Sequence, residues 1–225
     1  MIRKLLLISS LLLAQNAIAE CETNPGFLGA RYVETRSVIE PEKETVRHFA
    51  IWRSERQIAH EHSDSHLTEL WEKGASERMR LVLYFEEDQR GIEYQPGEEG
   101  LESSAEAWYI KSHLIGADML AGMDKTGDSG HGCGLAEVYE HEKDGQKVRI
   151  EWLPAVQLIK TAEWESSRGK TELRLEDTVS DPALVKTVFA RLSDYQTTDF
   201  ADIGDHESDP FLLKMINLGF TGHDH

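Results

Sequence analysis

Pairs of strand-like segments joined by short polar turns run through the middle of this 225-residue sequence. In 147–152 charged and apolar residues alternate strictly, as in a strand with one buried face. Asp144-Gly145 precedes this segment and predicts a type I′ turn, in which both central residues need a positive φ. Residues 135–141 are therefore the expected partner strand of a hairpin.

Other segments repeat this pattern or carry helix signals. Three further hairpins are predicted, namely 79–85 with 92–94, 156–164 with 171–175, and 46–52 with 57–62. Asp181 and Asp209 are each followed by a proline and then by apolar residues at helical spacing, which predicts two capped helices. Two shorter helices are predicted at 65–73 and 103–115.

Successive hairpins imply antiparallel strands, and the sequence has no alternation of strands with crossover helices. We therefore predict an α+β fold, with a curved antiparallel sheet built from successive hairpins and helices packed on one face. The hairpins at 79–94, 135–152 and 156–175 resemble those of the periplasmic lipoprotein-carrier half-barrels. In that family a curved antiparallel sheet wraps around helices and encloses an apolar cavity, so the resemblance implies a ligand-carrying fold.

The first 19 residues have the pattern of a cleavable secretory signal. Two basic residues precede a short apolar run, and Ala17 and Ala19 are the small residues that the cleavage site needs. The run is too short to span about 30 Å of hydrocarbon. We expect a periplasmic or secreted protein without stable membrane insertion, and one α+β domain over 20–225.

Acidic residues outnumber basic ones by 41 to 24, which gives a formal charge of −17. Loss of Arg3 and Lys4 with the signal would make the charge −19. Nucleic acid and anionic bilayer surfaces repel such a chain, so nucleic acid is not an expected partner.

Cys21 and Cys133 are the two cysteines of the sequence. In an oxidising compartment an even pair predicts a disulfide rather than two free thiols. The bridge would close a loop of about 110 residues, worth about 4 to 5 kcal/mol on the loop-entropy model. It would attach the new N-terminus to the glycine-rich loop around Cys133.

Histidines suggest a metal site. His60 and His62 would project from the same face of a strand, and His66 could reach them from the start of the following predicted helix. Three imidazoles could bind Zn²⁺ or Cu²⁺. The alternative is that these histidines are exposed surface residues without a ligand. The acidic stretch 199–209 is interpreted mainly as a connector whose carboxylates cap backbone donors, with calcium binding as the alternative.

No complete catalytic set is found. Gly127-Asp-Ser129-Gly130 matches part of the sequence around a trypsin-like nucleophile, but its flanking residues do not match. The leading hypothesis is therefore a non-catalytic binding or carrier protein for an apolar or amphipathic small molecule. Its cavity would be lined by residues such as Leu81, Leu83, Ile150 and Trp152. A divalent-metal-binding periplasmic protein is the second hypothesis, and an enzyme of unknown class is the third.

Overall fold

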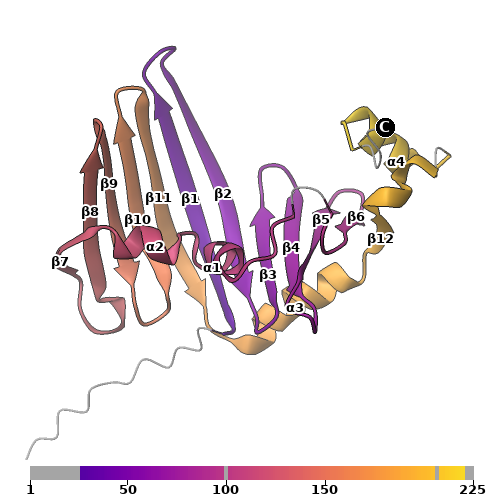
Figure 1. The fold of residues 1–225 in the computed structure, drawn as a ribbon, viewed down its shortest axis with the longest axis horizontal. Coiled ribbons are helices and arrows are strands. Elements are labelled where there is room, and N and C mark those ends of the chain that lie inside the picture. The colour runs from indigo at the N-terminus through magenta and orange to yellow at the C-terminus, as the bar shows by residue number, and fades with distance from the viewer. Residues whose placement is uncertain (1–25, 99–100, 206–207, 221–225) are drawn as a thin grey trace, which may run out of the picture.

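The computed structural model describes residues 26–98, 101–205 and 208–220, and its framework is one twelve-stranded sheet. The strands are β1 (Leu28–Val38), β2 (Lys43–Arg53), β3 (Gln57–His62), β4 (Leu67–Lys73), β5 (Met79–Phe85), β6 (Arg90–Tyr94), β7 (Asp124–Ser129), β8 (Ala136–Lys143), β9 (Gln146–Leu153), β10 (Leu158–Ser166), β11 (Gly169–Val179) and β12 (Gln196–Asp199). Their order is β12-β6-β5-β4-β3-β2-β1-β11-β10-β9-β8-β7, and every pair is antiparallel except β12 with β6. The predicted α+β class and curved antiparallel sheet are confirmed, with β12 and β6 as a parallel pair that was not predicted (Figure 1).

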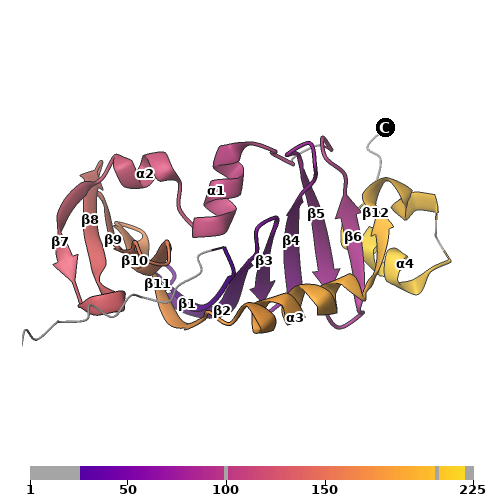
Figure 2. The same cartoon turned by 90° about the horizontal axis from the view of Figure 1, so that it is seen from below.

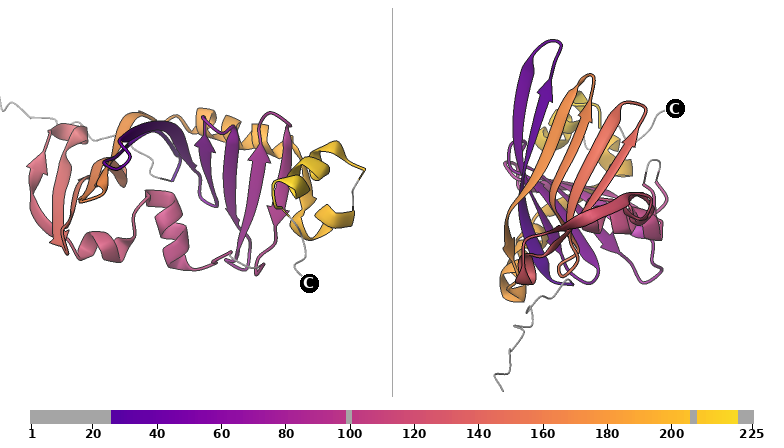
Figure 3. Two further views of the ribbon diagram at one scale, coloured as in Figure 1. Left: turned by 90° about the horizontal axis from the view of Figure 1, so that it is seen from above. Right: turned by 90° about the vertical axis from the view of Figure 1, so that its left-hand side faces the viewer.

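Helices lie on both faces of this curved sheet. The short helices α1 (Ala105–His113) and α2 (Ala117–Ala121) lie on the concave face, whereas α3 (Pro182–Ser193) runs along the convex face (Figure 2). The view from above shows the same arrangement, with α4 (Pro210–Asn217) beyond β6 (Figure 3). Two 3-10 turns, η1 (Gly132–Gly134) and η2 (Phe200–Asp205), complete the described elements. The prediction had placed all helices on one face.

Alternate residues of the central strands explain why both faces need a cover. On β2, Ile51 belongs to the concave core, whereas Ala50 and Trp52 belong to the convex core. The convex core is closed by α3 through side chains such as Val185 and Phe189. A strand that buries both faces must be covered on both, which places α3 opposite α1.

The prediction of a helix at 65–73 is wrong. This segment contains β4, which pairs with β3 and β5. Leu70 packs in the convex core and Trp71 in the concave core. Apolar side chains on both faces remove the alternation typical of strands and mimic helical spacing. Pairing with two neighbouring strands then decides the conformation.

The predicted turn and the two predicted helix caps, which depend on only a few neighbouring residues, are confirmed. Asp144 and Gly145 have φ values of 52° and 76°, as the predicted type I′ turn requires. Asp181 accepts a hydrogen bond from the backbone N–H of Ala183 and begins α3, and Asp209 begins α4 in the same way. The central strand β1 and the edge strand β7 were not predicted, and β1 joins the two halves of the sheet by pairing with β2 and β11.

Candidate functional site

A row of side chains crosses the concave face beyond the cover of α1 and α2. In this row Val148 of β9 lies opposite Trp164 of β10. Trp164 lies opposite Thr171 of β11, which in turn lies opposite Arg36 of β1. Val148 and Trp164 are partly buried against the concave core, which fixes the face. The hairpin ends that carry the row extend past both helices (Figure 1).

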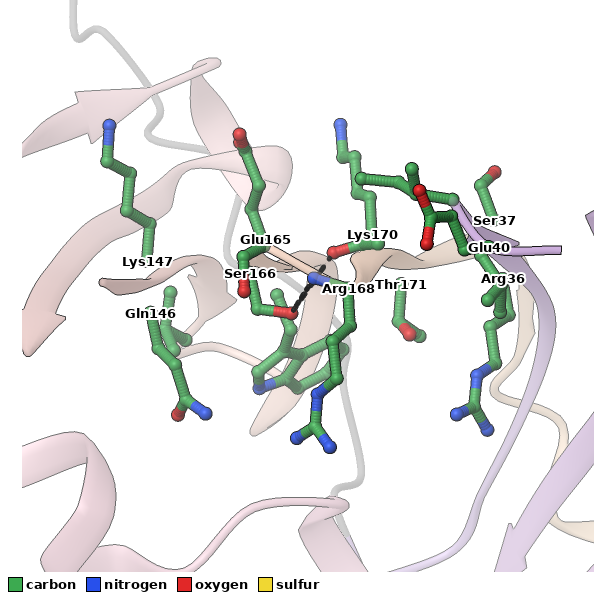
Figure 4. Close-up of a pocket in the computed structure, with 16 residues that line it drawn as sticks. Arg36, Ser37, Glu40, Gln146, Lys147, Glu165, Ser166, Arg168, Lys170 and Thr171 are labelled. Carbon is green, nitrogen blue, oxygen red and sulfur yellow. Dashed lines mark hydrogen bonds between the residues drawn. The ribbon is translucent and has the colours of Figure 1, made fainter. Parts of the chain in front are cut away.

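These hairpin ends line a groove with a volume of about 730 Å³, which we call the tip groove. Its lining residues are 36–40, 146–148 and 164–171. The side chains of Gln146, Arg168 and Arg36 point to one side of the strands, and those of Lys147 and Glu165 point to the other (Figure 4). The groove therefore presents guanidinium groups on the side that also carries Trp164.

Gly169 lets the ends of β11 and β1 approach closely at the base of the groove. Its φ is 149°, a conformation that favours glycine, and a Cβ atom there would overlap the Ser37 carbonyl. The backbone N–H of Ile39 donates to the carbonyl of Arg168 at 3.1 Å. The hairpin ends are thus joined by backbone contacts, and the groove does not depend on side-chain packing alone.

Charge in the groove opposes the charge of the whole chain. Four lining residues are cationic and two are anionic, although the chain carries −17 overall. Lys170 is paired with Glu163 at 2.7 Å. Within the described residues, the guanidinium groups of Arg36 and Arg168 have neither an ion-pair nor a hydrogen-bond partner. The tip groove is therefore a locally cationic site beside a half-buried tryptophan.

Below the groove, Arg53 fixes α1 to the concave face. Its side chain is buried and donates to the carbonyls of Ser112 at 3.2 Å, Val156 at 2.7 Å and Gln157 at 3.3 Å. Burial lowers the pKa of Arg53 to about 10, so the group stays charged at neutral pH. Carbonyls in the last turn of a helix lack partners within that helix, and Arg53 supplies one for Ser112.

His60 supplies a second partner for the end of α1. Its Nε2 atom lies 2.8 Å from the Lys111 carbonyl, and its ring packs edge-on against Trp71 at a centroid separation of 4.7 Å. Burial lowers the pKa of His60 to about 4, so the ring is neutral at neutral pH. A contact with a carbonyl requires the proton to be on Nε2, which prevents that nitrogen from binding a metal.

The structure does not bring the three predicted metal ligands together. His62 Nε2 lies 3.9 Å from Glu69 Oε1, and His66 Nε2 lies 3.9 Å from Glu87 Oε1. Across 26–98, 101–205 and 208–220, no three His, Cys, Asp or Glu side chains are grouped so as to hold a metal ion. Binding of Zn²⁺ or Cu²⁺ therefore gains no geometric support and stays a prediction.

Ser129 has a structural partner. Its Oγ donates to the Glu151 carboxylate at 3.0 Å. Burial raises the pKa of Glu151, but hydrogen bonds from Lys160, Ser129 and Arg149 outweigh it and lower the pKa. A carboxylate that is held ionised by two cations is a weak general base, so this geometry does not activate the serine.

In the acidic stretch, two carboxylates act as expected of a connector. Asp199 accepts from the backbone N–H of Ala201, and Asp209 caps α4 while pairing with Arg90 at 3.1 Å. The predicted Cys21–Cys133 disulfide cannot be followed, because Cys21 lies outside the described residues. So do residues 1–19 of the predicted signal.

The predicted cavity lining needs correction. Ile150 and Trp152 are buried in the concave core, and Leu81 packs against that core. None of these three, nor Leu83, lines the tip groove. The alternation of Trp164 with Glu163 and Glu165 is a sequence signal that could have placed this tryptophan on the concave face.

No protein-family model matches this chain, and no curated protein matches it. Solved structures match in fold. PNGF-II has a TM-score of 0.41 at 7% identity, covering 76% of this chain, which spans only 31% of that protein's length. An outer membrane lipoprotein-sorting protein domain from Vibrio parahaemolyticus has a TM-score of 0.31 at 10% identity, covering 75% of this chain and 92% of that one.

A LolA superfamily protein from Nitrosomonas europaea has a TM-score of 0.25 at 10% identity, covering 68% of this chain and 86% of that one. The likeness to these solved structures is weak and concerns the fold alone. Among the described residues, no helix has the length and apolar character needed to cross a bilayer; the longest, α3, has 12 residues.

Proposed function

We propose that this protein is a non-catalytic carrier or binding protein for an apolar or amphipathic small molecule, held on the concave face at the tip groove. The observation that carries the proposal is the groove itself, where Trp164 and Val148 are only partly buried although they adjoin the core. The signal-like pattern of residues 1–19 supports the further proposal that the protein acts after export.

Apolar contact supplies the driving force. Removing about 200 Å² of ligand apolar surface from water contributes roughly 5 kcal/mol at 25 cal/mol per Å². Taken alone, roughly 5 kcal/mol corresponds to a dissociation constant of about 0.2 mM. Contact with the Trp164 ring adds to this driving force and ordering of the ligand subtracts from it, so we expect a dissociation constant of roughly 10 to 500 μM for a groove open on one side. No chemical step is needed for this role, which fits the absence of an activated serine at Ser129.

Titration of the protein into Nile red tests the proposal. We expect a blue-shifted, enhanced emission with a dissociation constant in the micromolar range, and a loss of affinity of about five-fold in Trp164→Gln, equivalent to roughly 1 kcal/mol. Leu184→Gln is the matched control, because Leu184 is 55% exposed on α3 at the opposite face.

Two outcomes would contradict the proposal. One is an unchanged dye spectrum at protein concentrations far above the micromolar range. The other is an equal effect of Trp164→Gln and Leu184→Gln on affinity. Circular dichroism of both variants checks that the fold is retained.

A further inference from the structure

We propose that Arg36 and Arg168 bind the anionic head of an amphipathic ligand whose chain lies on Trp164 and Val148. This inference rests on the carrier function proposed above and names the class of ligand. It starts from position, because Arg36 lies in the same cross-strand row as Trp164, separated from it by Thr171. Arg168 lies in the turn between β10 and β11 and points to the same side as Arg36 (Figure 4).

The two arginines differ from most others in the described chain. Arg31, Arg80 and Arg191, for example, are each paired with at least one carboxylate, as expected in a protein rich in acidic residues. Arg36 and Arg168 are exposed, and within the described residues no carboxylate neutralises either of them. Two unpaired guanidinium groups facing one groove form a local anion site in an otherwise repulsive molecule.

Guanidinium groups suit a phosphate or carboxylate head, because their planar array of donors can make two parallel hydrogen bonds to such a group. The adjacent Trp164 and Val148 suit an acyl chain. A single amphipathic molecule satisfies both halves of the groove. An anionic bilayer does not, because it would face the −17 charge of the whole chain.

Competition for bound Nile red tests the inference. Lysophosphatidylglycerol and lysophosphatidylcholine with the same acyl chain are used below their micellar concentrations. They share the chain and the phosphate, but glycerol leaves the first lipid with a net negative charge, whereas the choline cation makes the second net neutral. At low salt we expect the anionic lipid to bind about ten-fold more tightly, with the preference reduced by salt that screens exposed charges. In Arg36→Gln/Arg168→Gln the preference should fall to about one-fold, with lysophosphatidylcholine affinity unchanged.

Arg149→Gln/Arg174→Gln is the matched control. It removes the same charge from strands β9 and β11, at positions that alternate with residues of the concave core and so lie on the opposite face. This control should keep the ten-fold preference. Equal loss of preference in both double variants would overturn the inference, since net charge and not the groove would then be responsible.

Other outcomes separate this inference from the carrier function. Equal binding of both lipids to the wild type would overturn the anionic-head site and leave the carrier proposal standing. Failure of dye and lipids to bind at all would overturn both. Competition by glycerol 3-phosphate at the same concentration as the lipid would also overturn the inference, because the site would then recognise free phosphate without a chain.

Discussion

His60 is a histidine that the fold keeps neutral. Desolvation is the main cause of its lowered pKa, and the nearby Lys111 ammonium and His62 add to it, while the hydrogen bond to the Lys111 carbonyl acts in the opposite direction. An unfolded chain has a histidine pKa of about 6.5. At pH values between about 6.5 and about 4, His60 therefore binds a proton in the unfolded state but not in the folded state.

This difference predicts a pH-dependent loss of stability. The contribution of neutral His60 is fully present above about pH 6.5 and is lost as the pH falls toward 4, by at most about 3 kcal/mol. His60→Gln keeps a donor for the Lys111 carbonyl but does not titrate. Urea unfolding measured across this pH range gives the unfolding free energy as a function of pH. This free energy should change less steeply with pH in His60→Gln than in the wild type, and equal pH dependence in the two proteins would refute the prediction.

At the scale of elements, α3 is held on the convex face by a polar network as well as by its apolar side. Arg191 pairs with Glu86 and, at 3.2 Å, with Glu61. Tyr195 and Thr68 also donate to Glu86, at 2.8 and 2.7 Å. These carboxylates are partly buried, so they depend on the arginine more than surface acids do.

Arg191→Met should therefore cost about 1 to 2 kcal/mol of unfolding free energy, less than for a fully buried pair because the arginine side chain is 38% exposed. Arg174→Met is the control, since its pair with Glu176 lies on the surface and should change stability by less than about 0.5 kcal/mol. Chemical denaturation compares the two. Equal losses would show that the α3 network adds nothing beyond a surface ion pair.

Elements that are determined by neighbouring residues could be predicted from the sequence, whereas those that depend on contacts distant in sequence could not. The turn at Asp144 and the caps at Asp181 and Asp209 depend on neighbouring residues, and all three were predicted. The strand β4 was mistaken for a helix, because its two-sided burial depends on α1 and α3, which are distant in sequence. The tip groove was missed, because pairing of β1 with β11 brings Arg36 beside Thr171 across more than 130 residues.

At the scale of the whole molecule, the predicted Cys21–Cys133 disulfide would join the N-terminal segment to the loop around Cys133. Thiol titration of the denatured, unreduced protein should find no free cysteine, and intact mass should place the N-terminus at Glu20. Cys133→Ser should lower the unfolding free energy by about 4 kcal/mol on the loop-entropy model. Two free thiols in the wild type would refute the bridge.

The sheet is open, and β7 ends it with one side unpaired in the part of the chain that the structure describes. A bare strand edge is a template onto which a strand of another copy can add. β7 carries Asp124, Lys125 and Asp128, and its ladder with β8 shifts register between Lys125 and Gly127. Edge charges and a local irregularity both oppose such addition. We therefore expect little tendency of this open sheet to polymerise through β7.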